Sequence, residues 1–210
     1  MMESRASLGT LAASQSNANR ETRMYTEPAG SRTFSIDLSR CPVVGFHATC
    51  AAASDQIETV GFLPNKFFDD ETHHSLLDVA NELHMPTSDQ GGYRTWLQAK
   101  SVSFTKKFEV AVAHADSGNA GGQGLAHIAA IVDLARSLPK HRPLIRRVER
   151  TIRRIQQSNR VVYAVDLSNF GDRLAVSADG QFCDIYYPAD QPLPAISIVD
   201  PARLLARLNL

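Results

Sequence analysis

The pattern of apolar and polar positions predicts an α+β fold that starts near Phe34. Phe34, Ile36 and Leu38 alternate with polar residues, which is typical of a strand with one buried face. Short apolar runs predict the other strands, at 43–47, 102–105, 161–167, 174–176, 182–187 and 195–199. Strands therefore gather in the last third of the chain.

Apolar residues at helical spacing predict helices at 51–60, 72–83, 106–115, 125–138 and 141–157. Gly61 ends the first of these, while Pro86 and Gly91-Gly92 are expected to break the helical pattern after the second. Residues 116–124 read as a loop. A last helical turn is expected after Asp200-Pro201, with Leu204, Leu205 and Leu208 packing back onto the domain.

Residues 1–33 differ from the rest of the chain, because they are rich in Ser, Ala, Asn, Thr and Arg and nearly lack large apolar side chains. Two interpretations stay open: a disordered tail, or an uncleaved export signal that resembles those of bacterial injected effectors. The folded domain is expected over 34–210. Within it, the region near 125–160 reads as a helical insertion.

Composition narrows the partners and the compartment. Hydrophobic residues make up 43% of the chain and charged residues 21%, with a formal net charge of zero, so no global attraction to nucleic acid or membrane is indicated. No apolar run reaches the length of a membrane span. Cys41, Cys50 and Cys183 form neither a disulfide framework nor a zinc pattern, which favours reduced thiols in a cytosol-like compartment.

Three stretches carry candidate chemistry. The first is Phe46-His47-Ala48-Thr49 at a strand end, followed by a short helix and by Gly61-Phe62-Leu63. The second spans 101–115, where a strand with Ser103, Phe104 and Thr105 leads into an Ala-rich helix containing His114. The third spans 180–205, where Asp184 begins a run that ends in Tyr187-Pro188 before the alternating residues 195–199.

In this order, these stretches resemble the motifs of the ADP-ribosyltransferase superfamily, which includes diphtheria toxin and the poly-ADP-ribose polymerases. The resemblance implies split antiparallel sheets around an NAD cleft, with flanking helices. It implies that His47 bonds a ribose hydroxyl of NAD and that the backbone of Ala48 holds the nicotinamide amide, with Thr49 beside them. Phe104 and His114 would take the places of two tyrosines that sandwich nicotinamide, and Ser103 and Thr105 would support the ligand.

The sequence departs from the family at the catalytic acid, because Asp184 stands where a Glu is expected. Its carboxylate would stabilise the oxocarbenium-like state formed when the nicotinamide–ribose bond breaks, but it is one methylene shorter. The resemblance thus predicts an NAD-dependent mono-ADP-ribosyltransferase that modifies a macromolecule, such as a protein of a host cell into which it is secreted as a virulence effector. Two alternatives stay open: a catalytically inactive binding module, and an enzyme like the RNA 2′-phosphotransferases.

The predicted helix at 141–157 is strongly amphipathic. Leu144, Ile145, Val148, Ile152 and Ile155 form its apolar side, and arginines from Arg146 to Arg154 cover the other. This basic face is either a solvated surface or a binding surface that would suit an acidic protein, a phosphorylated lipid or RNA. Between the macromolecules, a protein target is favoured over nucleic acid. His73, His74 and His84 lack a metal-ligand spacing, so no metal is predicted.

Overall fold

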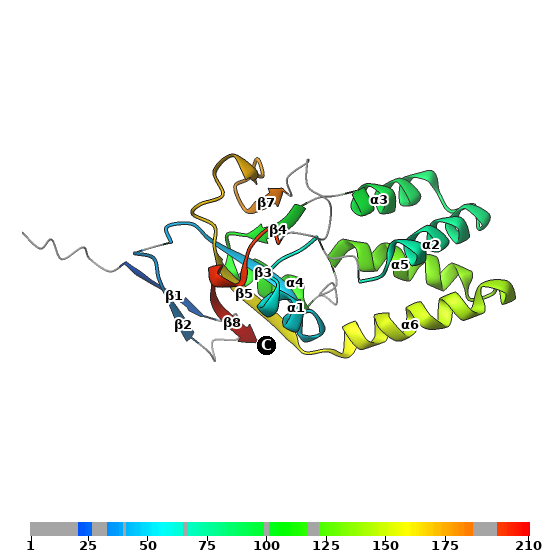
Figure 1. The fold of residues 1–210 in the computed structure, drawn as a ribbon, viewed down its shortest axis with the longest axis horizontal. Helices are drawn as coiled ribbons and strands as arrows, with labels where there is room; N and C mark the ends of the chain where they lie inside the picture. Colours follow the sequence, from blue (N-terminus) through cyan, green and yellow to red (C-terminus); the bar gives the residue numbers. More distant parts are fainter. Residues whose placement is uncertain are drawn as a thin grey trace, which may run out of the picture.

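A computed structural model describes residues 21–26, 33–39, 41–64, 67–98, 101–116, 122–186 and 197–210, apart from the side chains of residues 87–89, 96, 122 and 123. The described chain is α+β, as predicted, with antiparallel sheets (Figure 1). The α-helices are α1 (Ser54–Thr59), α2 (Asp70–Glu82), α3 (Thr87–Gln98), α4 (Phe108–His114), α5 (Gly122–Ala135) and α6 (Arg142–Gln157). The strands are β1 (Thr22–Thr26), β2 (Thr33–Asp37), β3 (Val44–Cys50), β4 (Ser101–Thr105), β5 (Arg160–Asp166), β6 (Leu174–Val176), β7 (Phe182–Tyr186) and β8 (Leu204–Asn209).

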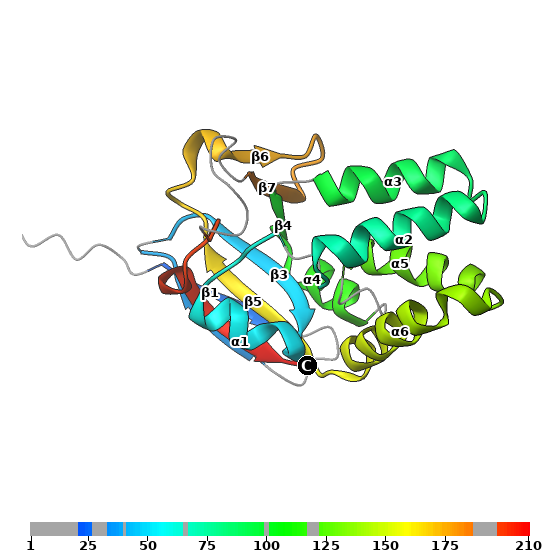
Figure 2. The same cartoon turned by 45° about the vertical axis from the view of Figure 1, so that its right-hand side comes forward.

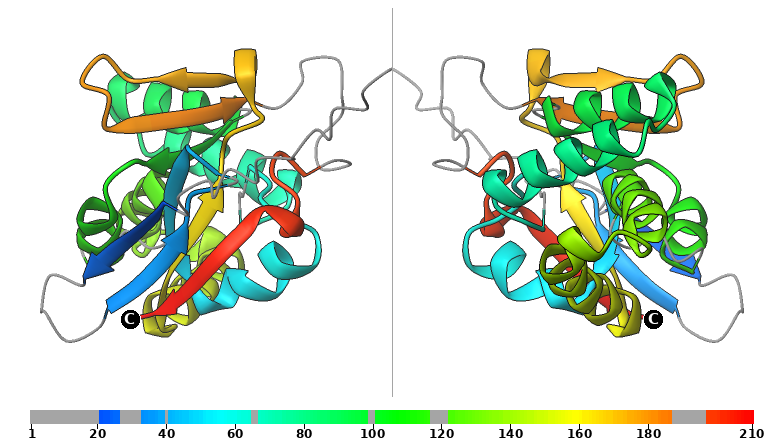
Figure 3. Two further views of the ribbon diagram at one scale, coloured as in Figure 1. Left: turned by 90° about the vertical axis from the view of Figure 1, so that its left-hand side faces the viewer. Right: turned by 90° about the vertical axis from the view of Figure 1, so that its right-hand side faces the viewer.

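The central sheet has six strands in the order β6-β7-β4-β3-β5-β8, with every neighbouring pair antiparallel. Strand β5 lies in the middle of the core, and its residues 161–165 are fully buried because both faces of the sheet are covered there. Strands β1 and β2 pair separately as a hairpin. The hairpin and α4 lie on one side of the central strands and α1 lies on the other (Figure 3).

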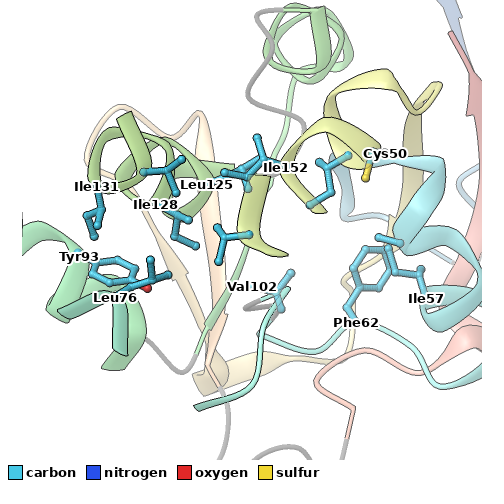
Figure 4. Packing of buried hydrophobic residues seen from close by; sticks show 14 of the residues in the cluster. Cys50, Ile57, Phe62, Leu76, Tyr93, Val102, Leu125, Ile128, Ile131 and Ile152 are labelled. Atoms are coloured by element: carbon cyan, nitrogen blue, oxygen red, sulfur yellow. The ribbon is translucent and has the colours of Figure 1, made fainter. Parts of the chain in front are cut away.

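Two groups of buried side chains hold these layers together. The smaller core lies under the hairpin and α4 and includes Ile36, Phe46, Phe108 and Val162. The larger core covers the opposite face of the sheet and continues into the helices (Figure 4). Within it, Val102 and Phe62 lie toward the sheet, and Leu76, Leu125 and Ile152 belong to helices.

Helices α2, α3, α5 and α6 lie together beside the sheet (Figure 2). The charged face of α6 points away from the larger core, since Ile145, Val148, Ile152 and Ile155 are buried. Asp69 caps α2 by accepting a hydrogen bond of 2.7 Å from the backbone N–H of Thr72. The predicted helices at 125–138 and 141–157 form as α5 and α6, and together with α2 and α3 they make up this helical layer (Figure 2).

Two predictions from the sequence pattern are wrong. A helix, α3, occupies the region where Gly91-Gly92 was expected to break the chain. A Cβ added at Gly92 would meet Cε1 of His127 at 3.0 Å, so the glycine permits close packing of α3 on α5. After a short 3₁₀ turn, the chain end forms strand β8 and not a helix.

The N-terminal boundary also needs correction. Residues 22–26 form strand β1, so the expected tail over 1–33 contains a folded element. The ring of Tyr25 stacks on that of Phe34 at 5.1 Å between centroids and meets Phe46 edge-on at 4.9 Å. In the predicted strand at 195–199, residues 195 and 196 lie outside the described residues; Val199 forms a single bridge with Phe62.

Candidate functional site at the opening of the sheet

The central sheet is nearly separated into two halves between β3 and β4. Strand β3 pairs with β5 over its whole length, from Val44↔Asp166 to Cys50↔Arg160. Strand β4 pairs with β7 from Ser101 to Thr105. Between β3 and β4, by contrast, Phe46↔Thr105 is the sole register pair among these strands' described residues. Beyond this pair, toward the C-terminal end of β3, the ladder between the two strands ends, and we call this interruption of the ladder the opening.

Backbone groups of β3 point into this opening. The N–H of Leu167 donates to Val43 O and the N–H of Ala51 donates to Asn159 O, both at 2.8 Å, so the odd-numbered residues of β3 bond to β5. Because peptide groups in an antiparallel strand alternate sides, those of Ala48 point toward β4. A continued ladder would place Ser103 opposite Ala48, but the register ends before that pair.

The side chain of His47 bridges the opening in place of the missing ladder pair. Its Nδ1 lies 2.9 Å from the carbonyl oxygen of Ser103. A carbonyl oxygen only accepts, so Nδ1 carries the hydrogen, and in the neutral ring Nε2 is left as an acceptor. Burial lowers the pKa of His47, with the hydrogen bond to Ser103 opposing the shift and the charge of His114 adding to it. The imidazole is therefore neutral at pH 7.

Aromatic rings fix the orientation of the His47 imidazole. Its centroid lies 5.0 Å from that of Phe62 and 5.5 Å from that of Phe104, and these two phenyl rings are 5.5 Å apart. Phe104 is 1% exposed, so its ring is enclosed by protein. In this arrangement the Phe104 ring packs against His47, and its stacking on nicotinamide stays a prediction.

The remaining residues of the first two motifs fall around the opening in different ways. Thr49 is buried on the same face as His47, and Thr105 is buried with its hydroxyl 3.1 Å from Gln181 O. Ser103 is exposed on β4. His114 lies at the exposed end of α4, close enough to influence the pKa of His47.

Asp184 does not share a cleft face with His47, contrary to the sequence prediction. Strand β4 lies between β3 and β7, and Asp184 sits opposite Ser103 on β4 and Ala175 on β6. Its neighbours Cys183 and Ile185 point into the larger core, on the face that contains the ring of His47. By alternation along the strand, the carboxylate of Asp184 projects from the opposite face.

Cys183 therefore occupies the position on β7 that faces the same side as His47, but it does not supply a nucleophile. The side chain is 1% exposed. Burial raises the pKa of its thiol, and the charge of Asp184 adds to that shift against the opposing charge of Lys106. A protonated, enclosed thiol is an inert core group.

Sequence reasoning missed a polar chain behind His47. Tyr163, which pairs with His47 across β3 and β5, donates its hydroxyl to Glu58 Oε1 at 2.6 Å. Nη1 of Arg207 on β8 donates to the same oxygen, also at 2.6 Å. Burial, followed by the bond to Glu58, raises the pKa of Tyr163 to about 12. These residues come from α1, β5 and β8, so no local motif reveals them.

A second candidate surface lies on α6. Arg146, Glu149, Arg150 and Arg153 line a surface hollow of about 490 Å³. Among the described residues, no cluster of three or more His, Cys, Asp or Glu side chains is placed to bind a metal ion. In the same part of the chain, each helix is too short or too polar to cross a bilayer.

Comparison with known proteins gives no independent assignment: the chain matches no family model, no curated protein and no solved structure.

Proposed function

We propose that this protein binds NAD at the opening between β3 and β4 and uses it as an ADP-ribose donor. The observation that carries the proposal is the end of the β3–β4 ladder at Phe46↔Thr105, which directs the peptide groups of Ala48 into the opening beside His47. A carboxamide such as that of nicotinamide needs one donor and one acceptor side by side, which is what one peptide edge of an open strand presents.

The tautomer of His47 suits the ribose part of the same ligand. With Nδ1–H held by Ser103 O, the Nε2 atom accepts a hydrogen bond from a ribose hydroxyl. Packing against Phe62 and Phe104 holds the ring in one orientation before any ligand arrives. In this proposal, His47 contributes to binding in the ground state and in the transition state alike, so it governs affinity more than turnover.

The position of Asp184 favours a second candidate function, an ADP-ribosyltransferase-like module that binds without catalysis. On the face away from His47, the Asp184 carboxylate is poorly placed to stabilise an oxocarbenium ion formed beside that histidine. In this second case, binding through the basic face of α6 would be the main activity.

Calorimetry with NAD, followed by transfer of label from NAD into a cell lysate, separates the two functions. For the enzyme we expect saturable NAD binding and incorporation of label into a macromolecule; for the module, no label is incorporated. His47→Ala should weaken NAD binding by about tenfold, the effect of one lost hydrogen bond. His74→Ala is the control, since this exposed histidine on α2 bonds within its own helix, to Asp70 O at 2.7 Å. Absence of NAD binding in the wild type would remove the NAD proposal.

A further inference from the structure

The outer face of α6 carries a stripe of arginine side chains along the helix. Arg142, Arg146, Arg150 and Arg153 are separated by four, four and three residues, so they project from one side. All four are exposed, opposite the buried isoleucine and valine side chains of the same helix. With a rise of 1.5 Å per residue, the stripe is about 16 Å long.

These charges are not neutralised by neighbouring side chains. Glu149 is the one acidic residue of α6, and its Oε1 accepts a hydrogen bond of 2.8 Å from Nε of Arg136, the residue just after α5. Across the described ranges, none of Arg146, Arg150 and Arg153 forms an ion pair. Arg147 differs, because its Nη2 donates to Thr72 Oγ1 at 2.8 Å and so joins α6 to α2.

We propose that this stripe docks an acidic helix of a partner protein. Guanidinium groups pair with carboxylates through two parallel hydrogen bonds, and a helix with carboxylates three and four residues apart repeats the spacing of the stripe. The hollow between Arg146, Arg150 and Arg153 gives a side chain of the partner a place to enter.

Two features favour a protein over a nucleic acid as the partner. Glu149, paired with Arg136, lies in the hollow, so a row of phosphates would meet a carboxylate there, whereas a protein surface can present groups of both signs. The chain as a whole has no net charge and a pI of about 7.1, so it lacks the broad positive field of nucleic-acid-binding domains. The arginine stripe lies on one helix, which suits a partner of similar width.

A labelled acidic peptide tests this proposal without NAD, so its result is independent of the proposed nucleotide site. The probe is a helical peptide of about 18 residues with glutamates on one face, followed by fluorescence anisotropy at about 50 mM salt. An RNA of about the same net charge is the competing probe. We expect saturable, salt-sensitive binding of the peptide and weaker binding of the RNA.

Two charge-matched variants locate the binding. Arg150→Glu/Arg153→Glu should weaken peptide binding by about tenfold or more, since it reverses two contacts. Arg23→Glu/Arg94→Glu makes the same change in net charge on β1 and α3 and should alter binding less than about twofold. The neutral variant Arg150→Gln/Arg153→Gln should show an intermediate loss of peptide binding. This graded loss would distinguish an effect of charge from misfolding of the charge-reversal variant. Equal losses in the two Glu variants, tighter binding of the RNA, or absence of peptide binding would each overturn the proposal.

Discussion

At the scale of single residues, the behaviour of the opening depends on a neutral, oriented His47. Its Nδ1–H is committed to Ser103 O, and its ring is held between Phe62 and Phe104. Protonation would add a second hydrogen and a charge in a desolvated place, which is why the pKa is lowered. Nε2 is thus a hydrogen-bond acceptor over the whole pH range in which the His47 ring stays neutral.

The lowered pKa of His47 predicts loss of stability in acid. The folded protein binds this proton less readily than the unfolded chain, whose histidine titrates near pH 6.5. The contribution of neutral His47 to the free energy of unfolding is complete above about pH 6.5. It is lost as the pH falls through that value toward the lower pKa of His47 in the folded state. We expect the urea midpoint to fall between about pH 7 and pH 5 and His47→Gln to flatten this dependence. Parallel pH curves for the two proteins would contradict it.

Gly61 is a second residue whose identity is set by its surroundings. Its φ is +98°, and a Cβ added at this position would collide with both Ser197 Oγ and Val199 O. Both the left-handed backbone and the close approach of another segment therefore require glycine.

We expect Gly61→Ala to reduce the free energy of unfolding by roughly 2 kcal/mol or more, combining backbone strain with displacement of 197–199. Gly91→Ala is the matched control: a Cβ added there would have no atom within 4 Å, and the residue is in helix α3. That variant should be neutral or more stable by about 0.5–1 kcal/mol. Denaturant unfolding measures both, and similar values for the two would refute the steric argument.

At the scale of elements, the strongest periodic segments were predictable and the ambiguous ones were not. The helix at 141–157 and the strand at 161–167 have long, one-sided or wholly apolar patterns, and they form as α6 and β5. The chain end was misread because Leu204 and Leu208 satisfy a helical spacing as well as an alternating one. Pairing with β5 stabilises the strand conformation of β8, and this pairing arises only in the tertiary structure.

The hairpin β1–β2 illustrates the same limit. Residues 22–26 contain only two large apolar side chains, Met24 and Tyr25, so their composition predicts a tail that does not pack on the domain. Tyr25 nevertheless lies in an aromatic cluster with Phe34, Phe46 and Phe108, which covers the smaller core.

We expect Tyr25→Ala to destabilise the protein by about 1–3 kcal/mol, because it removes a partly buried ring from this cluster. Met24→Ala, on the neighbouring position, should have little effect, since Met24 is 63% exposed. Deletion of residues 1–33 should lower the melting temperature by several degrees, as it removes β1 entirely. An unchanged melting temperature after the deletion would show that the hairpin is dispensable.

At the scale of the whole molecule, the order of strands decides which residues meet. Sequence reasoning placed His47 at a strand end and Asp184 on a late strand. Asp184 does lie in β7, but His47 lies in the middle of β3, which continues to Cys50. The insertion of β4 between them is long-range information, and so is the alternation that turns Asp184 to the other face. The hydrogen-bonded chain Tyr163–Glu58–Arg207 could not be predicted from the sequence for the same reason, because its residues meet only through long-range pairing.

The arrangement of the whole molecule also predicts that the two proposed binding surfaces act independently. The opening lies in the sheet. The arginine stripe lies on the exposed side of α6, a helix of the layer beside the sheet (Figure 2). The two are joined through the larger core, which contacts the buried face of α6 and not its charged face. Exposed charges are screened within about 8 Å at physiological salt, so a change in the stripe should not reach the opening.

We therefore expect Arg150→Glu/Arg153→Glu to leave the NAD dissociation constant within about twofold of the wild type, while His47→Ala weakens it by about tenfold. Asp184→Ala should also leave NAD affinity nearly unchanged, because Asp184 and His47 lie on opposite faces of the sheet. Calorimetry on the three variants gives the comparison directly. A loss of NAD affinity in the α6 variant comparable to that in His47→Ala would place the arginine stripe at the nucleotide. A similar loss in Asp184→Ala would show that the sheet rearranges on binding and brings the acid to the side of His47.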